Sequence, residues 1–107
     1  MLQHQRNSRD ANKKEMDRKT LHLLIEGKVQ GVFYRASAKE KADEMKVTGW
    51  VKNTKAGNVE IVCQAGETEL QQFLNWCKQG PSRAIVEHIE VTETSAAQFQ
   101  DFRILKE

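Results

Sequence analysis

The order in which strand-like and helix-like patterns follow one another constrains the fold of this 107-residue chain more than any other feature. Alternating or continuous short apolar runs mark strands, and apolar residues spaced three and four apart mark helices. The predicted strands are 21–26, 50–53, 58–63, 84–91 and 99–105, and the predicted helices are 36–45 and 70–77. The length is that of one domain and too short for two full-sized domains.

The resulting order, β-α-β-β-α-β with a short fifth strand, is that of the ferredoxin-like α+β sandwich. In this architecture an antiparallel sheet carries two helices on one face. The strands 21–26 and 50–53 run parallel with 58–63 between them, so their C-terminal ends meet at one edge of the sheet. The loop 28–34 and Asn53 should therefore lie side by side, although they are far apart in the sequence.

Residues 1–19 lack a repeating apolar stripe, and we expect a flexible N-terminal extension before a domain that spans 20–107. The extension holds six of the 17 Lys and Arg residues but only three of the 15 Asp and Glu residues. The remainder is therefore slightly acidic, although the whole chain has a formal charge of +2. Nucleic-acid binding would rest on the extension alone, and we expect none.

The scarcity of long apolar segments and of cysteines constrains the compartment of the protein and its association with membranes. No apolar run is long enough to span a bilayer, and the N-terminus has no apolar segment typical of a secretory signal. Two cysteines do not make a disulfide framework. We therefore expect a cytoplasmic protein without a membrane partner.

The loop after the first strand has the features of an anion site. It carries Gly27 and Gly31 and enters a helix, where successive backbone N–H groups are free to point at an anion. Arg35 stands at the helix start, where the macrodipole disfavours a cation by about 0.3–1 kcal/mol. A bound anion between Arg35 and the N–H groups would explain this placement. The alternative is an arginine that faces solvent or pairs with a carboxylate.

Three segments at matching spacing resemble the acylphosphatase family. They are GKVQGVFYR at residues 27–35, GWVKN at 49–53 and GNVE at 57–60. The family patterns are a G-x-V-Q-G-V-x-[FY]-R loop and a G-[WY]-V-x-N strand before a D-G-x-V-E hairpin. The resemblance runs from about Leu21 to Glu107, with Lys28 where Arg is common and Tyr34 where Phe is common. It implies a ferredoxin-like fold and hydrolysis of acyl phosphates to a carboxylate and phosphate.

The resemblance also implies roles for individual residues. Arg35 matches the phosphate-binding arginine of the family, and Asn53 matches the residue that positions the attacking water. The matching phosphate cradle consists of the backbone N–H groups of Gln30, Gly31, Val32, Phe33, Tyr34 and Arg35. A small-molecule acyl phosphate is the implied partner, no cofactor is implied, and we expect a monomer. On residue type alone, Asn53 is better explained as a turn residue that bonds its own backbone.

Metal binding is not indicated by the sequence. The three histidines, His4, His22 and His88, lie at no spacing typical of metal ligands.

Other functions remain open at this point. Cys77 and Arg83 fit the C-x-x-G-x-x-R pattern of cysteine-dependent phosphatases, but Cys77 ends a helix and lies on its apolar stripe, which favours a core cysteine. A non-catalytic ferredoxin-like binding domain is a second alternative; RNA-recognition domains of this topology need strand aromatics, which 21–26 and 59–63 lack. A third alternative is an acylphosphatase-like domain that binds carbamoyl phosphate within a larger maturation enzyme. The short chain argues against this alternative.

Overall fold

The computed structural model of the protein describes residues 18–106. Its elements are β1 (Lys19–Lys28), α2 (Tyr34–Glu44), β2 (Thr48–Asn53), β3 (Val59–Ala65), α3 (Glu67–Gln79), β4 (Ile85–Thr94) and β5 (Phe102–Ile104). The predicted order of elements is confirmed. Of the predicted N-terminal extension, residues 1–17 lie outside the described residues, whereas Lys19 opens β1.

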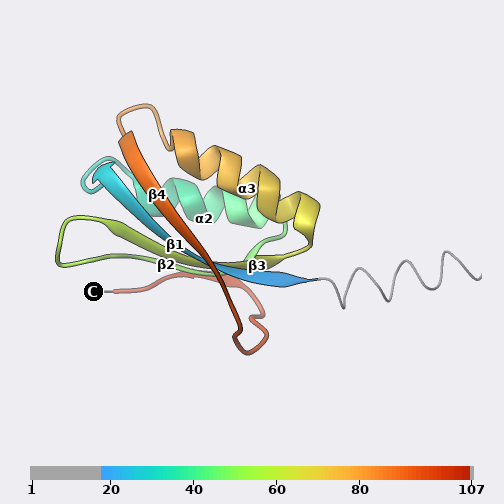
Figure 1. Cartoon of the computed structure of the whole chain (residues 1–107). Helices are drawn as coiled ribbons and strands as arrows, with labels where there is room; N and C mark the ends of the chain where they lie inside the picture. The colour runs from blue at the N-terminus through green and yellow to red at the C-terminus, as the bar shows by residue number, and fades with distance from the viewer. Residues whose placement is uncertain (1–17, 107) are drawn as a thin grey trace, which may run out of the picture.

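The five strands form one sheet in the order β4-β1-β3-β2-β5, and both helices cover the same face (Figure 1). β3 lies between β1 and β2 and is antiparallel to each, so β1 and β2 run parallel as predicted. The sheet is nevertheless mixed, because β5 pairs with β2 in parallel. β4 runs antiparallel to β1, and the segment 95–101 turns the chain back, which leaves β5 in the direction of β2.

The core lies between the helices and the covered face of the sheet. On α2, Ala38 and Ala42 are fully buried, and their small side chains allow the helix to lie close to the sheet. On α3, the predicted apolar stripe supplies buried Phe73 and Cys77, and the ring of Phe73 lies 5.8 Å from that of Phe102 in β5. The helical stripe seen in the sequence is therefore the face that packs on the sheet.

Gly27 lies at a bulge in β1, one residue before the strand ends at Lys28. Its φ is +134°, and a Cβ at this position would collide with the backbone carbonyl of Ile85 on β4. The pairing of β1 with β4 also shifts by one residue between Glu26 and Gly27. Only glycine permits this close approach and this backbone angle together, so the bulge just before the loop requires Gly27.

No helix within residues 18–106 combines the length and the apolar character that crossing a membrane requires.

Candidate active site

The loop between β1 and α2 is anchored by two buried valines. Val29 and Val32 are 1% and 5% exposed and belong to the hydrophobic core. Between and after them the chain turns sharply, since Gly31 has φ +74° and Phe33 has φ +65°. The left-handed conformation of Phe33 costs of order 1–3 kcal/mol for a residue with a side chain. The two valines therefore hold a loop whose backbone is locally strained.

This loop presents a row of backbone N–H groups. The first helical bond of α2 runs from the N–H of Ser37 to the carbonyl of Phe33 at 3.0 Å. Among the turn, loop and cap hydrogen bonds of residues 18–106, none is donated by an N–H group of residues 30–36. A helix start leaves its first N–H groups without intrahelical partners, and the macrodipole adds a positive potential there. The loop and the first turn of α2 thus offer unpaired backbone N–H groups of the kind that suits an anion.

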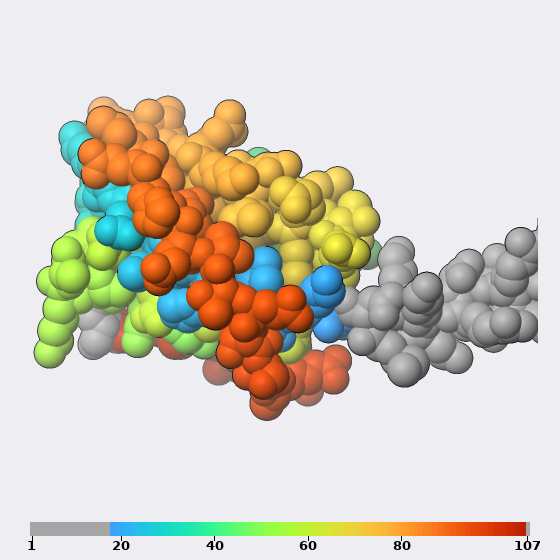
Figure 2. Space-filling view, viewed as in Figure 1, coloured from blue at the N-terminus to red at the C-terminus, as the bar shows by residue number. Residues whose placement is uncertain are grey.

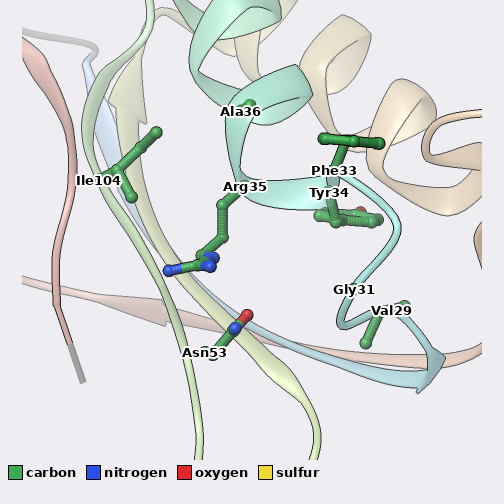
Figure 3. A pocket seen from close by; sticks show the side chains of 8 residues that line it. All are labelled: Val29, Gly31, Phe33, Tyr34, Arg35, Ala36, Asn53 and Ile104. Carbon is green, nitrogen blue, oxygen red and sulfur yellow. The ribbon is translucent and has the colours of Figure 1, made fainter.

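Arg35 extends from the first turn of α2 into the same region (Figure 3). Its side chain is half-buried, and its guanidinium points towards Asn53. No ion pair or side-chain hydrogen bond within residues 18–106 involves Arg35. The alternative in which a nearby carboxylate neutralises this arginine is therefore not found in the described part of the chain.

Asn53 is the last residue of β2 and is only 8% exposed. Its Oδ1 atom is buried and accepts no hydrogen bond from residues 18–106. A buried acceptor left unpaired costs roughly 1–3 kcal/mol. Bonding to its own backbone, the alternative noted for a turn asparagine, does not occur. The structure therefore holds a hydrogen-bond acceptor at the pocket without satisfying it.

The side chain of Gln30 ties the loop to the hairpin that follows Asn53. Its Nε2 group donates to the carbonyl of Thr54 at 2.9 Å and to that of Asn58 at 2.8 Å. This confirms the predicted proximity of the loop and Asn53. The sequence indicated only the backbone N–H of Gln30, so the role of its amide in holding the loop was missed.

A pocket of about 370 Å³ opens between the loop, α2 and the sheet edge. Its lining consists of Val29, Gly31, Phe33, Tyr34, Arg35, Ala36, Asn53 and Ile104 (Figure 3). Two residues of the predicted cradle, Gln30 and Val32, do not line it. Ile104 joins the site from β5, and nothing in the sequence pointed to it.

Tyr34 contributes to the pocket wall but keeps its hydroxyl elsewhere. The side chain is 1% exposed, and its Oη donates to the carbonyl of Cys77 at 2.6 Å. Burial, with smaller contributions from Cys77, raises the pKa of Tyr34 far above its ordinary value. The hydroxyl therefore stays protonated and bound to the end of α3, and it is not available as an acid for chemistry in the pocket.

Cys77 is enclosed in the core rather than placed in the pocket. Its exposed fraction is 0%, and burial raises the pKa of its thiol well above the ordinary value. Arg83, the other residue of the cysteine-phosphatase pattern, is exposed and does not line the pocket. A buried, protonated thiol cannot attack a phosphoryl group, so the geometry contradicts a phosphatase built on this pair.

The histidines give no metal site in the described residues. No cluster of three or more His, Cys, Asp or Glu within residues 18–106 is placed to hold a metal ion. His22 contacts Glu60 with 2.6 Å between Nε2 and Oε2, His88 is exposed, and His4 lies outside the described residues.

Comparisons with known proteins agree with this geometry. The acylphosphatase family model matches residues 21–104. An acylphosphatase from Syntrophus aciditrophicus is 48% identical over 88 residues, which cover 81% of this chain and 92% of that protein. One from Marinobacter nauticus is 49% identical over 83 residues, which cover 77% and 90%. The solved structure of an acylphosphatase from Coxiella burnetii superposes with a TM-score of 0.82 at 36% identity, covering 87% of this chain and 98% of that one.

Proposed function

We propose a catalytic site for this chain, which belongs to the acylphosphatase family and hydrolyses acyl phosphates. The proposed site is the pocket between β2 and the loop that joins β1 to α2. In this proposal Arg35 and the backbone N–H groups of residues 30–35, of which all but Gln30 and Val32 line the pocket, bind the phosphate, and Asn53 orients the attacking water. The observation that carries it is that Arg35 and Asn53 line one pocket, and that neither the guanidinium of Arg35 nor Oδ1 of Asn53 has a partner within residues 18–106.

The reaction needs little more than this set of groups. The leaving group of an acyl phosphate is a carboxylate, whose conjugate acid has a pKa of ~4, so no general acid is required at neutral pH. The transition state of phosphoryl transfer is loose, and catalysis consists mainly of binding the equatorial oxygens and aligning the nucleophile. Arg35 is suited to bidentate binding of two phosphoryl oxygens, and the N–H groups stabilise the remaining negative charge.

Asn53 orients the water by accepting one of its hydrogens at Oδ1. The water oxygen forms a bond to phosphorus while the bond from phosphorus to the acyl oxygen breaks, and its electron pair leaves with the carboxylate. A carboxamide is not a base at neutral pH, so the proton lost by the water passes to a phosphoryl oxygen of the substrate. The products are a carboxylate and dihydrogen phosphate. Every step uses groups of this chain, the substrate or water.

The proposal includes a monomer in the cytoplasm. Both cysteines, Cys63 and Cys77, are free and buried, which supports a reducing compartment. The predicted domain 20–107 is supported by the family match, which begins at residue 21, although β1 already opens at Lys19, one residue before that boundary.

The assignment is tested by comparing benzoyl phosphate with p-nitrophenyl phosphate, with and without EDTA. We expect selective hydrolysis of the acyl phosphate that EDTA does not change, because a phenolate is a more basic leaving group than a carboxylate. Arg35→Ala should lower kcat/KM about 1,000-fold and weaken inhibition by inorganic phosphate. The exposed Arg83→Ala is the matched control and should stay within about twofold of wild type. Full activity of a folded Arg35→Ala variant contradicts the proposed site.

Asn53→Ala separates the two roles within the pocket. It should lower kcat about 100-fold, because the water is no longer held in line, while inhibition by inorganic phosphate is retained. Equal loss of turnover and of phosphate inhibition would instead make Asn53 part of the phosphate-binding surface.

A further inference from the structure

Two exposed apolar side chains stand at the mouth of the pocket. Phe33 is 76% exposed and Ile104 is 41% exposed, and both line the pocket. They come from the start of α2 and the end of β5, and they lie on either side of Arg35 (Figure 3). The other large apolar side chains that are exposed within residues 18–106, Ile85 and Val91, belong to β4.

Phe33 gains little from its position in the folded chain. Its backbone is left-handed, which disfavours a large side chain, and its ring remains mostly in solvent. Burial of the Phe33 ring therefore does not compensate for the strain of its backbone. An exposed aromatic residue in a strained conformation at the edge of a pocket points to a role in binding.

The charge of the pocket limits which acyl group suits it. Among its lining residues only Arg35 is charged, and the hydroxyl of Tyr34 is bound to Cys77. No carboxylate, lysine or histidine of the described residues lines the pocket beside the phosphate-binding groups. Once the phosphate occupies Arg35 and the loop N–H groups, a second charge on the acyl group would lose water without gaining a partner.

We propose that Phe33 and Ile104 form an apolar rim that binds the acyl group of the substrate and selects uncharged acyl phosphates with an aromatic or branched aliphatic body. This inference rests on the proposed function of the pocket, since the rim adjoins the phosphate-binding loop. With the phosphate held by the loop, the acyl carbon is directed out of the pocket between the two side chains. Contact with the rim removes apolar surface of the acyl group and of both residues from water.

The test compares benzoyl, acetyl and succinyl phosphate as substrates of the full-length protein. For the wild type we expect kcat/KM to be highest for benzoyl phosphate and lowest for the charged succinyl phosphate. Phe33→Gly removes the ring, and glycine adopts the left-handed backbone without adding a side chain that could cap the N–H groups of the loop. It should lower the ratio of kcat/KM for benzoyl phosphate to kcat/KM for acetyl phosphate about tenfold, the effect of a lost apolar contact.

Ile104→Thr is the second rim variant, because it keeps a β-branched residue in β5. It should also lower kcat/KM for benzoyl phosphate selectively, by roughly threefold to tenfold. Ile85→Thr is the matched control, because it makes the same exchange at another exposed strand position. Ile85 belongs to β4, which runs along the surface visible in Figure 2. This control should leave the ratio of the two rates unchanged.

The outcomes separate the rim from the catalytic assignment. If the wild type hydrolyses acyl phosphates but both rim variants lower the rates for benzoyl and acetyl phosphate equally, the rim proposal is wrong and the catalytic site stands. A wild type that prefers succinyl phosphate over benzoyl phosphate also overturns the rim. If the wild type hydrolyses none of the three substrates, the proposed function fails and the rim fails with it.

Discussion

Replacement of Gln30 by Met tests how the phosphate-binding loop is held beside Asn53. The amide of Gln30 donates to the carbonyls of Thr54 and Asn58 at 2.9 and 2.8 Å, and Met keeps a similar length without any donor. Both bonds span more than 20 residues of sequence and cross from the loop to the hairpin after β2. The substitution therefore loosens the connection between the two halves of the site and leaves their own residues in place.

The expected loss of stability follows from what the two carbonyls retain. Thr54 O still accepts from the N–H of Gly57 at 3.2 Å, and Asn58 O still accepts from the N–H of Thr54 at 2.9 Å. Neither acceptor is orphaned, so the change removes two net hydrogen bonds of about 0.5–1.5 kcal/mol each. We expect the free energy of unfolding to fall by roughly 1–3 kcal/mol, measured by urea denaturation.

The effect on turnover distinguishes positioning from simple stabilisation. We expect Gln30→Met to lower kcat for benzoyl phosphate about tenfold below the unfolding transition, because the loop and Asn53 no longer keep their relative position. If Gln30 acts through Asn53, adding Gln30→Met to the Asn53→Ala variant should lower kcat less than about twofold relative to Asn53→Ala alone. The reason is that the effects of coupled residues do not add. Gln71→Met, which removes only an exposed bond of 3.2 Å to Asn75, is the matched control. Additive losses in the double variant would refute the positioning role.

Three further predictions follow from buried groups and from the limits of the site. Tyr34→Phe removes the 2.6 Å hydrogen bond to the carbonyl of Cys77, and urea denaturation should show a loss of stability of about 1–2 kcal/mol. The value of kcat should stay within about twofold of wild type, and a large loss of kcat would place the hydroxyl in the reaction. Burial raises the pKa of Cys63 from 9.0 to about 12, so the unfolded chain releases this proton at lower pH than the folded chain. The free energy of unfolding should therefore fall as pH rises from about 9 to 12. In Cys63→Ala the slope of this free energy against pH should be shallower, and an unchanged slope contradicts the prediction. Removal of residues 1–17 should leave kcat/KM within about twofold of wild type, because the residues that line the pocket lie between 29 and 104. Arg18 is kept because it donates hydrogen bonds to Thr48 and Gln64. Loss of turnover would show that the removed segment contributes to the site.

The sequence was sufficient for the order of the elements and for the edge at which the site lies. Period-two and helical patterns report which face of each segment is buried, and a β-α-β-β-α-β order allows few arrangements. The proximity of the loop to Asn53 follows from that topology, and Gln30 confirms it by contact. The unusual position of Arg35 at a helix start was also visible in the sequence, because dipole and charge oppose each other there.

Other parts of the site depend on contacts that no local pattern encodes. Ile104 reaches the pocket because the chain turns back after β4 and pairs β5 with β2 in parallel, a pairing that three residues of strand cannot indicate beforehand. The amide of Gln30 and the unpaired Oδ1 of Asn53 depend on strand register and on side-chain orientation at a distance. Periodicity records burial along one segment, whereas a binding site requires side chains from several segments to converge. That convergence arises only once the sheet has formed and the helices have packed on it.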